Sequence, residues 1–555
     1  MIDLFASVTP LIVAILSALW VVGAWRRTRH LARYFQLEGY ETSRYVQWLR
    51  RTKREYRPFA AGLAAFLALF WGSLLNVGFI VYLAVGFGLA VGFLVLQPRD
   101  TQVKQPFVRT PRAVRLLAVA RLLSIFPPAF YGIMALVNGG RGSPDTPLML
   151  AFFGATSGVT AMILAHAAHP LANVLLFPVE QAVRHKYMRL AKERLQGTGA
   201  CVICITGSYG KTSTKHYLQH FLSARYNTAM TPKSYNTLMG ISRYVNDTFA
   251  TPMPLDYFIA EADAYFVGEN ASICRLVEPH IGVVVSVGPM HLERLGSMAN
   301  VATAQYEIID SLPADGVGVF NGDDPLVREM AERGHPQTRL IISQKGATGA
   351  TLEAREVVLS ADGVRFTLYH TPTGESAPLY APLYGETNIT NILLAAAVAH
   401  HVGLPLRDIG TRAATLQPAD HRLMRRVFPD GTVILDDAYS ANPVGTKAAL
   451  EVLNLHRQGA HRIVISSGMF ELGAESDTRN EALGEHMAAC ATDVILIGAK
   501  QAAPIRVGAL AKGFPAERLH VVATLEDALA LYRTILTPGD TLLMLTDLPD
   551  VYAHA

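Results

Sequence analysis

Residues 205 to 215 read ITGSYGKTSTK, a run with two glycines that leads into Gly-Lys-Thr. In a loop of this kind the backbone N–H groups surround phosphate oxygens, the lysine pairs with β- and γ-phosphates and the hydroxyl ligates Mg²⁺. Ile205 stands where the usual pattern has its first glycine, so the run is a variant in which Gly207 takes that role. The residues expected to hold a nucleotide are Gly207, Ser208, Tyr209, Gly210, Lys211, Thr212 and Ser213.

Polar residues also follow two later apolar stretches. LDYFIAEADA predicts a strand that ends at Glu261, and HIGVVVSVGPMH predicts a buried strand that leads to His291. A carboxylate and a neutral imidazole at adjacent strand ends make a divalent-metal pair. The polar loop TPKSYNTLMG precedes them, and we expect its Asn236 to contact substrate.

The elements that position these residues have an α/β pattern. CVICIT predicts a buried strand before the phosphate loop, and a helix is expected to begin near Lys211, where its N-terminal dipole favours phosphate. Cys201 and Cys204 lie inside that strand and have no second pair at zinc spacing, so a buried strand is the better interpretation. After residue 417, the strands TVILDDA, HRIVISSG, DVILIG and TLLMLT alternate with helical stretches, which predicts a parallel sheet covered on both faces.

The first 178 residues have a different composition. Half of the chain is hydrophobic, and five apolar segments in this part, about residues 8–25, 58–75, 77–97, 115–137 and 147–168, are long enough to span a bilayer. Arginines and lysines gather in the loops 26–57 and 98–115, which places both loops in the cytoplasm. We therefore predict a multi-pass protein of the cell (inner) membrane, with the N-terminus outside and everything after residue 178 in the cytoplasm. The net charge is only +4, and the basic residues flank the apolar segments, so nucleic acid is not expected as a partner.

Eight motifs, in their order along the chain, resemble those of the Mur ligases, which are ATP-dependent amide-forming enzymes of peptidoglycan precursor synthesis. They are TGSYGKTSTK, EADAYFVGE, VGPMHLERLGS, NGDDP, GETNITNILLAAAVA, HRLMRR, DDAYSANP and GMFELG. The resemblance covers residues 196 to 550 and is to the MurF type, which adds D-alanyl-D-alanine to a UDP-linked muramoyl tripeptide. It implies that ATP converts a carboxylate into an acyl phosphate, which an amine then attacks.

The resemblance also implies roles for single residues. Lys211 and Thr212 would hold the phosphates and a first Mg²⁺. Glu261 and His291 would hold a second Mg²⁺. The other residues it assigns are Asn388 for the base, Arg422 for the phosphates, Asp436 near the ribose, and Tyr439 and Asn442 along the cleft. Taken singly, Asn388 could instead be a helix cap, Arg422 a surface charge and Asp436 a turn residue.

The chain departs from the family in four places. Gln305 stands where many members have a lysine that becomes carbamylated and holds the second metal, and a glutamine cannot form a carbamate. Thr387 replaces a histidine, and LLMLTDLPD lacks the usual Lys-Gly-Ser. Apolar segments take the place of the domain that grips uridine, which suggests a substrate on a lipid carrier or a polymer at the membrane.

These inferences combine into one multi-domain prediction. An all-α transmembrane bundle of about five helices (1–178) and a linker helix (179–195) precede an ATP-binding α/β domain (196–416) and a Rossmann-like α/β domain (417–555). The predicted function is membrane-anchored ligation of a carboxylate-bearing peptide or lipid-linked precursor to an amino acid or dipeptide, with ATP, Mg²⁺ and membrane lipids as partners. Two alternatives are a capsule-type poly-amino-acid ligase and a nucleotide-binding membrane scaffold without turnover.

Overall fold

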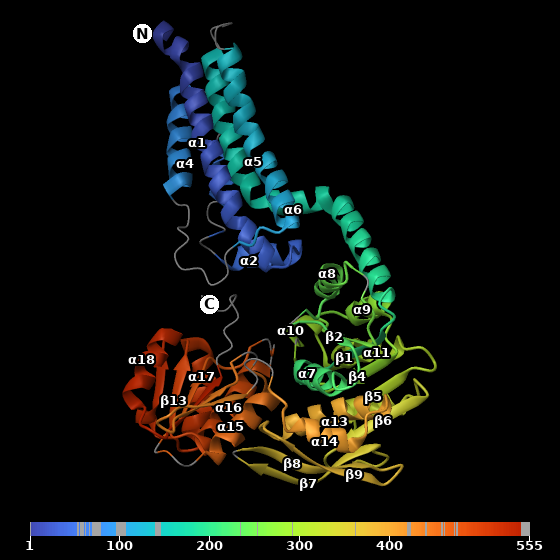
Figure 1. Ribbon diagram of the computed structural model, residues 1–555. Coiled ribbons are helices and arrows are strands. Elements are labelled where there is room, and N and C mark those ends of the chain that lie inside the picture. Colours follow the sequence, from blue (N-terminus) through green and yellow to red (C-terminus); the bar gives the residue numbers. More distant parts are fainter. Residues whose placement is uncertain are drawn as a thin grey trace. The chain divides into compact units, whose positions relative to one another are not determined.

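The computed structural model describes most of the chain and forms two compact units, residues 1–184 and 185–555 (Figure 1). The described residues are 2–52, 55, 60–61, 63–65, 67–68, 79–95, 107–138, 146–232, 235–251, 253–290, 292–360, 362–418, 423–438, 441–456, 459, 461–470, 472 and 475–545.

The first unit is helical, as the apolar segments predict. Its helices are α1 (Ile2–Leu37), α2 (Thr42–Arg51), α4 (Phe79–Val95), α5 (Pro111–Asn138) and α6 (Thr146–Gln196), the last of which continues into the second unit. Within the described residues, three helices are long and apolar enough to cross a membrane, judged by length and composition alone: Val8–Leu37, Pro111–Val137 and Leu148–Gln196. The predicted span 77–97 corresponds to the shorter apolar helix α4, and most of the predicted span 58–75 lies outside the described residues.

Small residues let the helices of the first unit approach one another closely. The indole of Trp20 on α1 lies directly against Gly158 of α6, where any side chain would overlap the ring. Close helix contact over small residues is the usual way in which apolar helices associate. Arg27, also on α1, is buried here and pairs with the Glu55 carboxylate at 2.8 Å.

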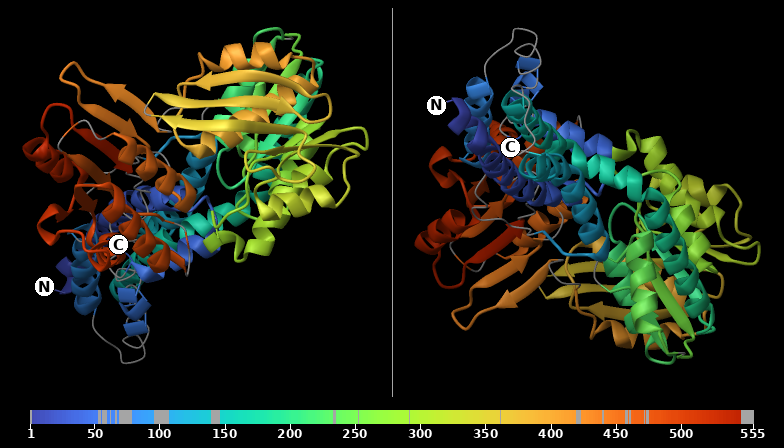
Figure 2. Two further views of the ribbon diagram at one scale, coloured as in Figure 1. Left: turned by 90° about the horizontal axis from the view of Figure 1, so that it is seen from below. Right: turned by 90° about the horizontal axis from the view of Figure 1, so that it is seen from above.

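The second unit begins with the middle domain, whose nine-stranded sheet has the order β2-β3-β1-β4-β5-β6-β7-β8-β9. Strands β2 to β7 pair in parallel, whereas β7, β8 and β9 are antiparallel (drawn in yellow in Figure 2). The elements are β1 (Cys201–Thr206), α7 (Lys211–Leu222), β2 (Thr228–Met230), α8 (Leu238–Thr248), β3 (Tyr257–Glu261), α9 (Glu269–Val277), β4 (Ile281–Val284), α10 (Leu292–Leu295), α11 (Met298–Asp310), β5 (Val317–Asn321), α12 (Pro325–Glu332), β6 (Thr338–Ser343), β7 (Leu352–Ser360), β8 (Gly363–His370), β9 (Glu375–Ala381), α13 (Glu386–His401) and α14 (Leu406–Ala413).

Alternate residues of strand β1 face different helices. Ile203 and Ile205 pack into a core with α7, α13 and α14, whereas Val202 and Cys204 pack into a core with the end of α6, α8 and α9. A strand buried on both faces needs an unbroken apolar run, and CVICIT provides one. The predicted buried strand is confirmed, and the loop that follows it lies at the carboxyl edge of the sheet.

The C-terminal domain has a six-stranded sheet of order β10-β11-β15-β12-β13-β14, parallel except for the β10–β11 pair. Helices α15, α16 and α17 share one hydrophobic core with the sheet, and α18 packs on its opposite face. The predicted parallel sheet with two covered faces is therefore confirmed. The elements are β10 (Met424–Val427), β11 (Val433–Asp436), α15 (Pro443–Leu455), β12 (Arg462–Ser466), α16 (Ser476–Cys490), β13 (Asp493–Ile497), α17 (Ala499–Ala511), a 3₁₀ helix (Ala516–Arg518), β14 (Leu519–Val522), α18 (Leu525–Ile535) and β15 (Thr541–Leu545).

Candidate nucleotide and metal site

The predicted phosphate loop joins β1 to α7, and its two glycines are required by the backbone. Gly207 has φ +145° and Gly210 has φ +82°, a region that L side chains rarely adopt. A Cβ atom on Gly207 would lie 2.9 Å from the Ser286 nitrogen, and one on Gly210 would overlap the Asn391 side-chain oxygen. No other residue fits either position without moving the neighbouring chain.

The segment that follows β4 holds this loop in place. The Ser208 N–H donates to the Ser286 carbonyl at 2.8 Å, and the Tyr209 N–H donates to the Ser286 hydroxyl at 3.0 Å. The Ser208 hydroxyl donates to the Gly288 carbonyl and accepts from the Gly288 N–H. These bonds join the loop backbone to the segment that follows β4.

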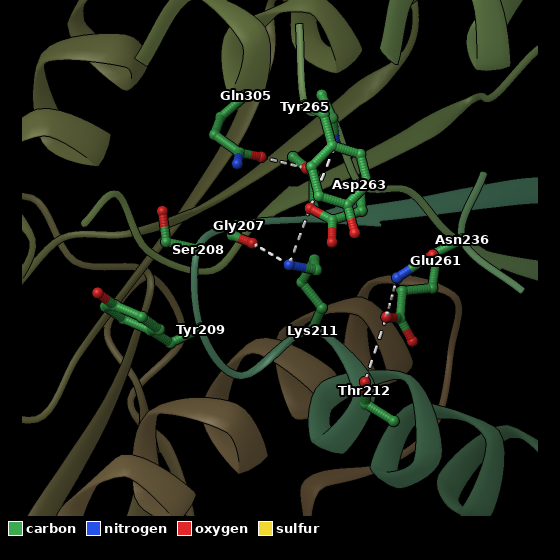
Figure 3. Close-up of polar contacts among 12 residues, drawn as sticks. Gly207, Ser208, Tyr209, Lys211, Thr212, Asn236, Glu261, Asp263, Tyr265 and Gln305 are labelled. Carbon is green, nitrogen blue, oxygen red and sulfur yellow. Dashed lines mark hydrogen bonds and ion pairs between the residues drawn. The ribbon is translucent and has the colours of Figure 1, made fainter. Parts of the chain in front are cut away.

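Lys211 and Thr212 begin α7 and lie beside two carboxylates (Figure 3). The Lys211 ammonium donates to the Gly207 carbonyl at 2.6 Å and lies 3.2 Å from Asp263 Oδ1. The Thr212 hydroxyl donates to Glu261 Oε1 at 3.2 Å. Ser213 is buried in the same turn. The predicted lysine, hydroxyl and first carboxylate are thus brought together.

Glu261 accepts hydrogen bonds from two further groups. The Lys215 ammonium lies 2.9 Å from Glu261 Oε2, and the Asn236 amide donates to Oε1 at 3.2 Å. The Glu261 side chain is 2% exposed and that of Lys215 is fully buried, so the pair is shielded from water. The structure thereby places Asn236, predicted to contact substrate, at the same carboxylate.

The donor atoms fit a magnesium–nucleotide. Among the described residues, no group of three or more His, Cys, Asp and Glu side chains is arranged to hold a metal ion by itself. Mg²⁺ does not need such a group, because it binds through one or two protein ligands together with phosphate oxygens and water. The hydroxyl of Thr212 and the carboxylate of Glu261 are oxygen donors that would suit such an ion, and they lie at the N-terminus of α7, where the helix dipole also favours phosphate.

Gln305 lies behind the loop, in the middle of α11. It is buried, and its carboxamide oxygen accepts a hydrogen bond from the Thr206 hydroxyl at the end of β1. Asn270 on α9 donates to the same hydroxyl at 3.3 Å and to the Ala304 carbonyl at 2.8 Å. The position at which the resemblance predicts a charged carbamate therefore holds a neutral amide that packs three elements together.

Two asparagines of α13 have different surroundings. The amide of Asn388 accepts from the Tyr217 hydroxyl at 2.6 Å and donates to the Tyr384 carbonyl at 2.7 Å. Asn391, one turn later, accepts a hydrogen bond from the Thr214 hydroxyl. Its side-chain oxygen lies next to Gly210 of the phosphate loop, at the position that a Cβ atom would occupy. The predicted contact of Asn388 with the base stays a prediction.

The predicted residues of the C-terminal domain form backbone contacts. Asp436 Oδ1 accepts from the Ala438 N–H at 3.2 Å, and Asn442 caps α15 by accepting from the Gly445 N–H at 2.8 Å. The remaining predicted site residues, His291, Arg422 and Tyr439, lie outside the described residues.

Tyr209 connects the loop electrostatically to the C-terminal domain. Burial raises the pKa of its hydroxyl, Arg479 opposes that effect and Glu475 adds to it. Arg479 lies on α16 and pairs with Glu475 at 3.0 Å. The start of α16 therefore lies close enough to the phosphate loop for its charges to act on Tyr209.

Sequence reasoning missed Asp263 and Lys215, although each has a signal in the sequence. Asp263 follows Glu261 by two residues, and side chains at that spacing in extended chain point to the same side. Lys215 lies one turn after Lys211 on the helix and so shares its face. Only the packing of β3 against α7 shows which cation meets which carboxylate.

Comparison with known proteins identifies the two α/β domains. Residues 205–399 match the family model of the Mur ligase middle domain, and residues 421–546 match that of the Mur ligase, glutamate ligase domain. The UDP-N-acetylmuramoyl-tripeptide--D-alanyl-D-alanine ligase of Mycobacterium tuberculosis (strain ATCC 25618 / H37Rv) is 30% identical over 415 residues, which are 70% of this chain and 80% of the relative.

Solved structures agree with this assignment. MurF from Acinetobacter baumannii superposes with a TM-score of 0.57 at 25% identity, over 66% of this chain and 77% of that one. The fold is also that of the MurF ligase from Thermotoga maritima in complex with ADP, with a TM-score of 0.57 at 22% identity over 66% of this chain and 80% of that one. The chain therefore belongs to the Mur ligase family, with middle and C-terminal domains of the MurF type that follow a region of apolar helices.

Proposed function

We propose that this chain is an ATP-dependent ligase of MurF type that joins a carboxylate to an amine in cell-envelope precursor synthesis, at the cytoplasmic face of the cell membrane. One observation carries the proposal: Lys211, Thr212 and Glu261 converge at a preformed phosphate loop. The names of the relatives support the same chemistry, since each is a UDP-N-acetylmuramoyl-tripeptide--D-alanyl-D-alanine ligase.

The proposed reaction has two steps. A carboxylate oxygen of the acceptor attacks the γ-phosphorus of ATP, and ADP leaves with the electrons of the broken bond. The amine then attacks the acyl carbon of the resulting acyl phosphate, phosphate leaves and the amine loses a proton. Mg²⁺ would offset the negative charge of the phosphates during this transfer.

The chain's residues position the reactants. Lys211 and the loop N–H groups would hold the β- and γ-phosphates, and Thr212 with Glu261 would orient the metal. His291 as a second metal ligand and Arg422 as a clamp from the C-terminal domain belong to the same proposal. In the same proposal Asn388 would contact the nucleotide base and Asp436 would lie near the ribose. The substrate cleft would be lined by Asn236, Tyr439 and Asn442.

The helices of the first unit are proposed to anchor the ligase domains. Three of them have the length and composition of membrane spans, and basic residues gather in the segments 26–57 and 98–115, the first of which includes the end of α1 and all of α2. By the distribution of arginine and lysine the N-terminus would lie outside and the ligase domains in the cytoplasm. Reporter fusions at residue 1 and after residue 184 test this orientation, and an active cytoplasmic reporter at the N-terminus contradicts it.

The acceptor is proposed to reside in the membrane. The N-terminal region consists of apolar helices rather than a domain that could grip uridine, so a lipid-linked muropeptide suits the chain better than a soluble one. Equal or faster turnover of soluble UDP-muramoyl tripeptide would argue against a lipid-linked acceptor while leaving ligase activity intact.

ADP release by the purified full chain is the direct test. The assay supplies ATP, Mg²⁺ and either D-alanyl-D-alanine or single amino acids, with lipid-linked or UDP-linked acceptor. We expect ADP only when both an acceptor and an amine are present, and none from Lys211→Ala. Lys447→Ala, a change at an exposed lysine of α15, is the matched control and should keep full activity. Nucleotide binding without ADP release under every condition would favour the scaffold alternative.

A further inference from the structure

Lys211 occupies a position that a bound phosphate would have to change. Its ammonium points at Asp263 Oδ1, 3.2 Å away, and at the Gly207 carbonyl, 2.6 Å away (Figure 3). The side chains of Lys211 and Asp263 are each 7% exposed. An ion pair with so little solvent around it is attractive, and separating its charges carries a substantial cost.

Asp263 is fixed by its backbone and cannot follow the lysine. Its N–H donates to the Asn236 carbonyl at 3.0 Å, and its Oδ1 accepts from the Ala264 N–H at 3.1 Å. Lys211, by contrast, has a flexible four-carbon side chain. A phosphate in the loop would therefore draw the lysine away and leave the carboxylate where it is.

Within the described residues, the ammonium one turn later on α7 and the amide behind the loop are both already engaged. The Lys215 ammonium is held by Glu261 at 2.9 Å, and the Gln305 amide beyond Thr206 is neutral. When a nearly buried carboxylate loses a facing ammonium group, another cation at the same place stabilises its charge. A divalent metal ion that binds together with the nucleotide would be such a cation.

We infer that Asp263 exchanges Lys211 for a divalent cation when nucleotide binds, and thereby couples metal binding to nucleotide binding. Without metal, Asp263 competes with phosphate for Lys211 and weakens nucleotide binding. With metal, the same carboxylate faces the cation and favours the complex. The inference deepens the proposed function and rests on residues 207–212 holding phosphate.

Asp263→Asn tests the inference, because the amide keeps the shape and removes the charge. The dissociation constant of ADP is measured by calorimetry on the full chain in detergent, once in EDTA and once in Mg²⁺. In EDTA we expect the variant to bind ADP about tenfold more tightly than the wild type, a difference of ~1.4 kcal/mol. In Mg²⁺ we expect no such gain, so the factor by which metal tightens binding should fall about tenfold. Unchanged or weaker binding of the variant in EDTA overturns the inference.

Metal binding supplies a second readout. Mn²⁺ titrated into the ADP-bound protein and followed by electron paramagnetic resonance should bind Asp263→Asn several-fold more weakly than the wild type, and equal affinity overturns the inference. Asp263→Ser serves if the asparagine variant does not fold. Asp247→Asn, at an exposed carboxylate paired with Arg243, is the matched control and should change neither constant.

The two levels of the proposal fail in different ways. A wild-type chain that binds no ADP even in Mg²⁺ removes the phosphate loop and the proposed function with it. A wild-type chain that binds ADP normally while Asp263→Asn behaves identically removes only the role of Asp263.

Discussion

The middle-domain sheet and the C-terminal sheet both carry polar side chains after their strands, but these side chains contact different kinds of group. At the first sheet, Glu261 and Asp263 face the ammonium groups of Lys215 and Lys211. At the second, Asp436 and Asn442 accept from backbone N–H groups of their own loops. A backbone contact shapes a loop, whereas a lysine can be drawn away by an anion. The proposed function therefore leads us to expect that substitutions at the first sheet change phosphate binding and that substitutions at the second mainly change loop stability.

The largest expected effect comes from breaking the buried pair of the first sheet. Lys215→Met leaves the Glu261 carboxylate, 2% exposed, without that ammonium, and removing one partner of a buried pair costs about 3–5 kcal/mol. We expect the melting temperature of the ligase domains, followed by differential scanning calorimetry, to fall by roughly 6–12 °C.

The matched control for this change is Lys447→Met on α15, where lysine and Glu451 are both exposed. It should shift the melting temperature by less than about 2 °C, since surface pairs contribute little. A double variant, Lys215→Met with Glu261→Gln, should recover part of the loss because the carboxylate that lost its ammonium is replaced by a neutral amide. An equal shift in Lys215→Met and the control would show that the buried pair adds no stability.

Two glycines with the same φ but different ψ allow the two domains to be compared. Gly210 in the phosphate loop and Gly498 before α17 both have φ +82°, but only Gly210 has a neighbour where a Cβ atom would go. Gly210, with ψ −12°, is in the left-handed α region, where alanine should cost about 1–2 kcal/mol of stability. Gly498, with ψ 131°, lies outside that region in backbone space that glycine alone enters readily, so its change to alanine should cost at least as much.

Gly210→Ala alone should also weaken nucleotide binding, by about thirtyfold or ~2 kcal/mol, because the new methyl group displaces Asn391 and the loop N–H groups with it. Calorimetric titration of both variants with ADP and Mg²⁺ measures the difference. Equal ADP affinities in the two variants would mean that the loop does not bind phosphate through its backbone.

Substituting Asn442, which caps α15, tests whether the polar residues of the second sheet affect stability rather than nucleotide binding. Asn442→Ala removes the acceptor for the Gly445 N–H, which should cost about 1 kcal/mol of stability and leave ADP affinity unchanged within about twofold. Asn442→Asp keeps a capping oxygen and should restore the melting temperature. If the aspartate variant regains stability but not the ligase rate, Asn442 contacts substrate as well as capping the helix.

The parts of this molecule that the sequence predicts are those governed by local pattern. The buried strand CVICIT, the glycines at 207 and 210 and the helix that begins at Lys211 follow from patterns within a dozen residues, and the structure has all three. The strand TLLMLT was also predicted, but its place between β11 and β12 depends on contacts between segments distant in sequence.

The contacts that distinguish the site were beyond the sequence for the same reason. Whether Glu261 meets Lys211 or Lys215 depends on how β3 is registered against β1 and how α7 is rotated. Gln305 was identified as a departure from the family, yet its bond to Thr206 requires α11 to lie behind the loop. Similarly, the spacing of Asn388 and Asn391 gives no sign of which one faces the phosphate loop.

The smallest expected effect lies on the surface, at the ion pair that joins the end of α6 to the end of α9. The Lys192 ammonium lies 2.6 Å from Glu278 Oε1, and the pKa of Glu278 is lowered, first by this hydrogen bond and then by Gln196 against the opposing effect of burial. A lowered pKa in the folded state stabilises the protein above the ordinary value of 4.5, and the contribution is lost as the pH falls through the folded value. Glu278→Gln should therefore lower stability at pH 7 by at most about 0.5 kcal/mol, less in high salt, with the difference shrinking as the pH falls below 4.5 and through the folded pKa of Glu278. Urea melts of both proteins across that range would contradict this account if the variant were equally weakened in acid, because a loss that ignores pH cannot come from the charge.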